Sequence, residues 1–283
     1  MFLNDLYLEE RHVLEMSAAK IYSDGKEEKE TASLLSEHLL EIYINEELTF
    51  RLACTPTCLS ELVMGRLLSE GIIRKADDVS YLSICRYGKT AEVYLSDRNG
   101  TVTTSDAPDK ETVSSHESNS SQESDSPFVE ETQTCCTDNH VLNRNFVRED
   151  LLPEIRPLDW KPEWIFSCAA VFREDTPLHK KTRSTHSCFL CRNGEILFTA
   201  EDIGRHNAMD KAIGHALLHD IPLGECYLYT SGRVPTDMMR KIVYAGVPLL
   251  ISKEYPTTDA AELASQHGIT LIGKARPESF LVF

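Results

Sequence analysis

The stretch HSCFLCRNGEILFTAEDIGRHNAMDK, residues 186–211, decides the fold of the C-terminal half of the chain. It begins with two apolar runs joined by Asn193 and Gly194, a pair that favours the tight turn of a β-hairpin. A polar segment at 201–207 follows, and a helical pattern begins at about residue 205. The stretch therefore predicts two hairpin strands and a helix that starts where the second strand ends.

The rest of this half alternates strand-like and helical patterns. Such an alternation is typical of a layered α/β structure whose strands are partly parallel. Upstream of the hairpin, Pro162 opens a further apolar helix, because proline suits a first helical turn. The expected elements are helices at 163–173, 205–219, 235–245 and 257–267, and strands at 226–230, 248–252 and 269–273.

The N-terminal part of the chain predicts a smaller lobe with both strands and a helix. Residues 41–54 alternate apolar and polar side chains around a turn at 45–47, as in a β-hairpin. A helix is expected at about 59–70, where Gly71 supplies a stop signal. Two strand-like runs follow, at 79–86 and 91–96.

The composition changes sharply at about residue 100. Between Ser105 and Thr134 there are eight serines, eight acidic residues and one lysine. Such a segment buries too little apolar surface to offset its ordering entropy, so we expect a mobile loop. The expected organisation is a charged leader at 1–40, an N-terminal α+β lobe at 41–104, an acidic serine-rich loop at 105–145 and a C-terminal α/β lobe at 146–283.

The net charge is −16, from 29 basic and 45 acidic residues. This charge argues against nucleic acid or an anionic membrane as a general partner, and an anionic ligand would need a local basic pocket. No apolar run approaches the roughly 20 residues of a membrane span, and the N-terminus lacks the pattern of a secretory signal. We therefore expect a cytoplasmic protein. Its nine cysteines favour buried thiols, metal ligands or sulfur chemistry over a disulfide framework.

Three junctions between a strand and the next helix have the residues of an anion site. They lie at 201–207, 230–235 and 252–258, and the carboxyl ends of the strands are where α/β sheets bind ligands. In the first two, a glycine that permits close backbone approach precedes an arginine that can bind phosphate oxygens. A phosphate-rich ligand explains all three junctions. Alternatively, Asp202 is a helix cap and the arginines are surface charges.

Two residue pairs on the helix at 205–219 have the spacing that lets side chains meet along a helix surface. They are His206 with Asp210 and Asn207 with Lys211. His206 lies near the positive end of the helix, which favours its neutral form, so it could position a ligand without a charge. The alternative is a structural pair on the helix surface, and spacing alone does not separate the two.

The stretch EDIGRHNAMDK, residues 201–211, resembles the signature of FdhD proteins, the formate dehydrogenase accessory sulfurtransferases. Three further stretches match in the same order: TPTCLSELVMGRLLSEGII at 55–73, SGRVPTDMMRKIVYAGVP at 231–248 and GITLIGKARP at 268–277. The resemblance covers about residues 41–283 and excludes the leader and the acidic loop.

The resemblance implies a cytidine-deaminase-like three-layer α/β sandwich with a smaller N-terminal α+β lobe, usually as a homodimer. It also implies a client ligand, the molybdenum (or tungsten) bis-guanine-dinucleotide pterin cofactor, and no tightly bound metal of the protein's own. The implied partners are a cysteine desulfurase and the catalytic subunit of formate dehydrogenase. The implied cofactor-binding residues are Gly204, Arg205, His206, Asn207, Asp210, Lys211, Ser231, Gly232, Arg233, Lys274, Ala275, Arg276, Pro277, Glu278 and Ser279.

The family carries a persulfide-forming cysteine in a C-x-x-C motif on a flexible loop between the lobes. Here Cys135 and Cys136 stand at the corresponding place, but they are adjacent and the expected glycines are absent. A persulfide cysteine must reach both donor and acceptor, which suits a mobile loop. Both residues are expected to be catalytic, with Cys135 aligned to the first family cysteine. The alternative is a family member that binds the cofactor but has lost sulfur transfer.

The chain has one C-x-x-C motif, Cys188 to Cys191, with His186 before it. Zinc is one interpretation. Strand geometry argues against it, because residues 188 and 191 point to opposite faces, and no H-x-E pair of a zinc deaminase is present. Ordinary packing is favoured. The same expectation of burial applies to Cys54, Cys58, Cys85, Cys168 and Cys226, and of packing to Trp160 and Trp164.

Overall fold

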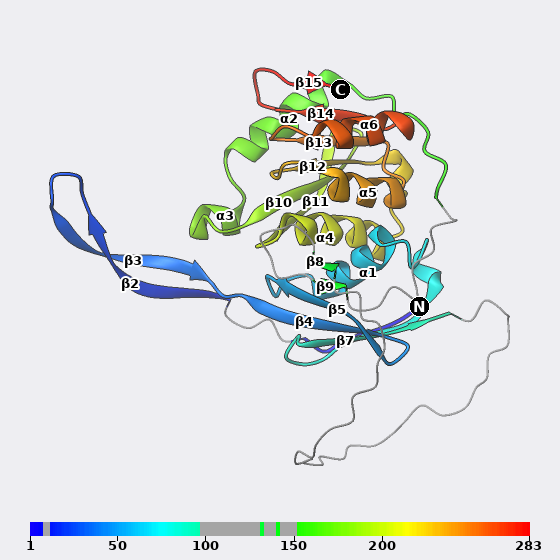
Figure 1. The fold of residues 1–283 in the computed structure, drawn as a ribbon, viewed down its shortest axis with the longest axis horizontal. Coiled ribbons are helices and arrows are strands. Elements are labelled where there is room, and N and C mark those ends of the chain that lie inside the picture. Colours follow the sequence, from blue (N-terminus) through cyan, green and yellow to red (C-terminus); the bar gives the residue numbers. More distant parts are fainter. Residues whose placement is uncertain (8–11, 97–130, 133–139, 142–151) are drawn as a thin grey trace, which may run out of the picture.

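The computed structural model describes residues 1–7, 12–96, 131–132, 140–141 and 152–283 (Figure 1). The predicted catalytic pair, Cys135 and Cys136, lies outside the described residues, as does most of 105–145. Within the described ranges, helices combine with three β-sheets, which confirms the predicted α/β class. None of the helices in these ranges is long and apolar enough to cross a membrane.

Six strands form the sheet of the C-terminal lobe: β10 (His186–Arg192), β11 (Glu195–Asp202), β12 (Tyr227–Thr230), β13 (Leu249–Ser252), β14 (Thr270–Gly273) and β15 (Leu281–Val282). Their order is β11-β10-β12-β13-β14-β15, and β12, β13 and β14 are mutually parallel, as predicted. Asn193 and Gly194 join β10 to β11 with φ values of 52° and 85°. These positive values suit a tight hairpin turn.

Helices cover both faces of this sheet. They are α2 (Pro162–Arg173), α3 (Pro177–Thr182), α4 (Arg205–Leu218), α5 (Thr236–Ala245) and α6 (Thr258–Gln266). Helices α4, α5 and α6 share one hydrophobic cluster with one face of the sheet, and α2 shares a second cluster with the other face. The C-terminal lobe therefore has three layers.

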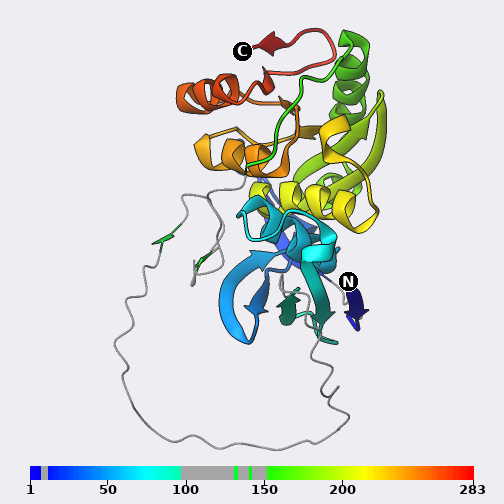
Figure 2. The ribbon, with the colours of Figure 1, turned by 90° about the vertical axis from the view of Figure 1, so that its right-hand side faces the viewer.

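The N-terminal lobe is a seven-stranded sheet with one long helix. The sheet contains β1 (Phe2–Asp5), β4 (His38–Ile44), β5 (Glu47–Cys54), β6 (Val79–Ile84), β7 (Thr90–Leu95), β8 (Glu131–Thr132) and β9 (His140–Val141), in the order β1-β6-β7-β4-β5-β9-β8. The helix is α1 (Leu59–Ser69). The predicted hairpin at 41–54 corresponds to β4 and β5. Figure 2 shows this lobe below the C-terminal lobe.

Part of the predicted leader is strand. Strand β1 pairs with β6, while β2 (Val13–Ile21) and β3 (Glu27–Leu35) form a separate two-stranded ribbon that extends away from the body of the protein (Figure 1). Nearly all side chains of this ribbon are exposed. It therefore lacks the buried face whose apolar periodicity would identify strands in a sequence.

One hydrophobic cluster runs through both lobes, because α1 lies against α4. The two helix backbones touch at two glycines. A Cβ atom placed on Gly65 would lie 1.7 Å from the carbonyl oxygen of Asp210, and one on Gly214 would lie 1.8 Å from that of Glu61. Only glycine permits such an approach, so these two positions set the distance between the lobes.

We predict that Gly65→Ala lowers the free energy of unfolding by about 3 kcal/mol, since the added methyl group meets rigid backbone. Urea denaturation followed by circular dichroism measures the change. Gly224→Ala is the matched control, because a Cβ atom there meets nothing within 4 Å. Equal denaturation midpoints for the two variants would contradict the tight crossing.

Candidate functional site

The three predicted junctions meet at one edge of the C-terminal sheet. Strands β11, β12, β13 and β14 all end there, and backbone hydrogen bonds tie their following residues together. The Lys253 N–H donates to the carbonyl of Thr230 (2.9 Å), and the Ala275 N–H donates to that of Ser252 (3.0 Å). The segment at 274–279 therefore lies beside the junctions, as expected for one shared site. We call this region the carboxyl edge.

Four cations of the carboxyl edge, at 205, 233, 253 and 274, have no carboxylate partner in the described ranges. Arg205, Arg233 and Lys253 form no ion pair or hydrogen bond through their side-chain nitrogens with any residue in the described ranges, and the Nε of Arg205 is buried. Lys274 lies 5.1 Å from the ring centre of Tyr255. Four cations without carboxylate partners in this part of the chain form the local basic surface that an anionic ligand needs on an acidic protein.

Gly232 makes room for Arg205. A Cβ atom at this glycine would lie 2.9 Å from Cδ of Arg205. The glycine of the second junction thus allows the arginine of the first to lie against it. At the third junction Thr257 caps α6, with its Oγ1 accepting from the N–H of Ala260 (3.3 Å).

Asp202 is fully buried. It is not the N-cap residue of α4, because that position is occupied by Gly204. One carboxylate oxygen accepts from the Gly204 N–H (2.9 Å) and from Asn207 (3.0 Å). The other accepts from the Thr55 N–H (3.0 Å) and from Lys211 Nζ (2.6 Å). The first junction is therefore fastened directly to the N-terminal lobe.

Asn207 and Lys211, whose spacing lets them meet along a helix surface, are instead fully buried and bind other partners. Asn207 donates to the carbonyl of Ala53 (2.8 Å). The ammonium of Lys211 donates to the carbonyls of Thr55 (3.0 Å) and Glu201 (3.1 Å). These two side chains hold the end of β5 against α4.

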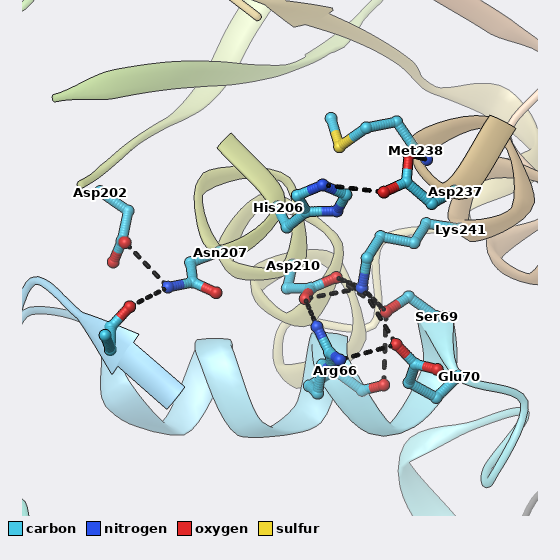
Figure 3. Close-up of polar contacts among 11 residues, drawn as sticks. Arg66, Ser69, Glu70, Asp202, His206, Asn207, Asp210, Asp237, Met238 and Lys241 are labelled. Carbon is cyan, nitrogen blue, oxygen red and sulfur yellow. Dashed lines mark hydrogen bonds and ion pairs between the residues drawn. The ribbon is translucent and has the colours of Figure 1, made fainter. Parts of the chain in front are cut away.

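The alternative of a structural His206–Asp210 pair on the helix surface is wrong (Figure 3). His206 Nε2 lies 3.3 Å from Oδ2 of Asp237 on α5. Asp210 binds the ammonium of Lys241 (3.0 Å) and accepts from Ser69 (2.7 Å). Helix periodicity correctly places His206 and Asp210 on one face of α4, but this face is packed against α1 and α5 and is not exposed.

Arg66 and Glu70 of α1's C-terminal end complete this cluster of charges. Arg66 is fully buried, 2.9 Å from Glu70 and 3.7 Å from Asp210, and Lys241 lies 3.5 Å from Glu70. Two cations thus face two carboxylates among α1, α4 and α5. Removing one partner of such a buried pair typically lowers the free energy of unfolding by about 3 to 5 kcal/mol. The cluster therefore holds α1, α4 and α5 firmly in their relative positions.

Burial lowers the pKa of His206 to about 2, and the cations Lys241 and Arg66 add to the effect. The neutral form expected from the sequence therefore follows mainly from desolvation. The helix end is not its main cause.

The predicted cofactor-binding residues thus divide into two sets. The fully buried set is His206, Asn207, Asp210, Lys211 and Ala275, and the set at the carboxyl edge is Gly204, Arg205, Ser231, Gly232, Arg233, Lys274, Arg276, Pro277, Glu278 and Ser279. A pocket beside Ser231 is lined by His179 and Lys253, which the sequence did not indicate, and by His186, which the sequence indicated only as a possible zinc ligand. A lone histidine or lysine has no sequence signal that would reveal this.

Cys188 and Cys191 point to opposite faces of β10, as predicted. Cys188 belongs to the cluster on the α4 side, whereas Cys191 lies 3.7 Å from Cys168 on the α2 side. Among the described residues, no group of three histidine, cysteine or acidic side chains is placed to hold a metal ion.

The predicted burial of the other cysteines holds for Cys54, Cys168 and Cys226. It is wrong for Cys58, which is exposed at the start of α1, and for Cys85, which is half-buried. Their apolar neighbours in the sequence belong to the core, but each cysteine lies at the end of its element. The tryptophans pack as predicted, with Trp164 stacked on Tyr227 and Trp160 edge-on to Phe280.

Fold and site together define an α/β protein with a basic carboxyl edge suited to an anionic ligand. The family model described as "FdhD/NarQ family" matches residues 35–283, so the chain belongs to the FdhD/NarQ family. Among its relatives is the sulfur carrier protein FdhD of Bacillus pumilus, 29% identical over 93% of this chain and 92% of the relative. That of Geobacillus kaustophilus is 30% identical over the same shares.

The fold is similar to the crystal structure of a formate dehydrogenase accessory protein from Desulfotalea psychrophila. The TM-score is 0.68, the identity is 23%, and the match covers 96% of each chain. This likeness extends to the N-terminal residues that the sequence resemblance left out.

We predict that the stability of the wild type falls more steeply with acidification than that of His206→Gln. The folded protein keeps His206 neutral down to about pH 2, whereas the unfolded chain takes up a proton below about pH 6.5. Between about pH 6 and about pH 4, this histidine alone lowers the free energy of unfolding by about 1.4 kcal/mol per pH unit.

Urea denaturation at several pH values measures the two slopes, and His267→Gln at the end of α6 is the control. A slope for His206→Gln equal to that of the wild type would contradict the neutral buried histidine.

Proposed function

We propose that this protein is a sulfur carrier that transfers sulfur from a cysteine desulfurase to the molybdenum (or tungsten) bis-guanine-dinucleotide pterin cofactor, for the catalytic subunit of formate dehydrogenase. The relatives named as FdhD sulfur carriers support the reaction class. The observation that carries the cofactor assignment is the basic carboxyl edge, where Arg205, Arg233, Lys253 and Lys274 lie without carboxylate partners in the described residues.

The ligand's chemistry agrees with that edge. Each guanine dinucleotide arm contains a pyrophosphate, and several separate cations suit two such arms better than a single phosphate. The guanidinium groups of Arg205 and Arg233 can each form paired hydrogen bonds to phosphate oxygens. The three-layer lobe also supports the cytidine-deaminase-like arrangement expected for the family.

The chain length around Cys135 and Cys136 supports their role. These residues belong to the seven-residue connection between Thr132 of β8 and His140 of β9. His140 pairs with Arg51 of β5, and Thr55 just beyond β5 binds Asp202 at the carboxyl edge. The step along the chain from Arg51 to Thr55 covers about 13 Å. Four residues counted from either end of the connection reach Cys136, and a chain of four residues can span about the same distance.

The proposed chemistry is two exchanges of one sulfur atom. The Cys135 thiolate attacks the terminal sulfur of the desulfurase persulfide, the sulfur–sulfur bond breaks, and the desulfurase thiolate leaves. Release of the terminal sulfur from Cys135 would then break the sulfur–sulfur bond and restore the Cys135 thiolate, with the cofactor in a reduced metal state supplying the two electrons. Cys136 is the second candidate for the same role.

We expect incubation with a cysteine desulfurase and cysteine to increase the intact mass of the wild type by one sulfur atom. The double variant Cys135→Ala/Cys136→Ala should show no increase, and the single variants identify the acceptor. Cys58→Ala is the control, because this cysteine is exposed but lies outside the connection. An unshifted wild-type mass would rule out persulfide formation.

The second candidate function is a cofactor chaperone without sulfur transfer, which the adjacency of Cys135 and Cys136 favours. It predicts that the double cysteine variant still activates formate dehydrogenase. Sulfur transfer predicts that this variant does not. The proposed homodimer expected from the family is compatible with both functions.

For the cofactor site, we predict that Arg205→Met and Arg233→Met each weaken binding of GDP about tenfold, since each removes a charged hydrogen-bond donor to phosphate. Isothermal titration calorimetry measures the affinity. Arg240→Met, an exposed arginine of α5 away from the strand ends, is the matched control. Unchanged GDP binding in both edge variants would exclude the carboxyl edge as the phosphate site.

A further inference from the structure

A pocket of about 170 Å³ opens beside Ser231 at the carboxyl edge. It is smaller than the roughly 300 Å³ at which sites for whole drug-sized ligands begin, so it suits one small group of a larger ligand. The lining residues that decide its chemistry are Phe172, Thr176, His179, His186, Ser231 and Lys253.

Ser231 holds the ring of His186. Its Oγ accepts the N–H of Ser187 (3.0 Å) and can donate its own hydrogen to Nδ1 of the neutral ring of His186, 3.1 Å away. With Nδ1 accepting, the hydrogen of the neutral ring sits on Nε2. No described residue takes that hydrogen, and His186 lines the pocket, so Nε2–H is available to a bound acceptor.

His179 and Lys253 add to the donors. Nδ1 of His179 lies 2.7 Å from the carbonyl of Thr185, which can only accept, so Nδ1 carries the hydrogen and Nε2 becomes a second donor when the ring is protonated. The ammonium of Lys253 has no partner among the described residues.

Two carboxylates, Asp175 and Glu254, also line the pocket, but both are already engaged. Asp175 pairs with Arg183 and Glu254 with Arg276. Glu201 accepts from Thr176 and from the first free N–H groups of α3. Because Asp175 and Glu254 are paired with arginines and the carboxylate oxygens of Glu201 are occupied by N–H and hydroxyl donors, the groups left to meet a ligand are His186, His179 and Lys253. All three favour an anion.

We propose that this pocket is an anion subsite in which His186 and Lys253 bind one phosphate group, with Ser231 as the residue that positions His186. The inference deepens the proposed function, because the phosphate belongs to the nucleotide cofactor. Free inorganic phosphate is the other source with the same chemistry. Ser231, which the family resemblance places in the cofactor site, then acts through His186, to which its hydroxyl is hydrogen-bonded.

Protonation should strengthen this subsite, because each imidazolium adds a positive charge. Burial lowers the pKa of His186, and the neighbouring cations Arg205 and His179 lower it further, whereas Asp202 opposes them. The other charged groups that face it are Lys253 and Glu254 after β13 and Asp175 before α3. Binding of an anion therefore rises as the pH falls through the histidine range.

Titration calorimetry on the full chain tests the subsite with GDP, guanosine and inorganic phosphate as probes. We expect His186→Asn and Lys253→Met each to weaken GDP binding about tenfold, as for loss of a charged hydrogen bond, and Ser231→Ala to weaken it less. Guanosine binding should not change. Lys180→Met, an exposed lysine on neighbouring α3, is the matched control.

Sulfate supplies a readout that a purely structural role would not move, because its charge is constant between about pH 8 and about pH 5.5, the range in which histidines titrate. Its affinity for the wild type should rise as the pH falls, and this rise should shrink in His186→Asn.

The outcomes separate the two proposals. If Arg233→Met weakens GDP binding but His186→Asn and Lys253→Met do not, the subsite is refuted and the proposed function stands. If the wild type binds inorganic phosphate through His186 and Lys253 but does not bind GDP, the subsite stands and the nucleotide source is refuted.

Discussion

The contact between α1 and α4 is the constraint on which the rest of the structure depends. At Gly65 and Gly214 the two helix backbones touch, with no side chain between them. Polar groups beside such a contact are shut off from water, so they must satisfy one another. Lys241 is hydrogen-bonded to Asp210, and Arg66 forms ion pairs with Asp210 and Glu70. The crossing of two helices from different lobes is thereby a single buried core of apolar and ionic contacts.

The signature at 201–211 serves this core and the ligand edge at once. Asp202, Asn207 and Lys211 bind the end of β5, and His206 and Asp210 face α1 and α5. Arg205, which belongs to the same stretch, lies instead at the carboxyl edge against Gly232. Much of a stretch that resembles a ligand motif therefore fastens the lobes together, which holds the few residues of the ligand edge in place.

The elements themselves were largely predictable. The hairpin around Asn193 and Gly194, the helix at 205–219 and the alternation to residue 273 all follow from local periodicity and turn chemistry, and the structure has each of them within a few residues. The exposed ribbon β2–β3 and the six-residue α3 were not predictable, because one has no buried face and the other is too short for a helical period. The exposure of Cys58 was missed for a similar reason, since burial depends on neighbours that are distant in sequence.

By itself, the sequence determined the α/β class, the order of the elements in the C-terminal half, and a set of glycines, arginines and cysteines whose chemistry suits a phosphate ligand and sulfur. Only the tertiary structure decided which of these residues face a ligand. Periodicity defines the face of a helix on which a side chain lies, but what covers that face comes from remote segments. For this reason His206 and Asp210 became interior residues, while His186, which the sequence indicated only as a possible zinc ligand, and Lys253 came together beside Ser231.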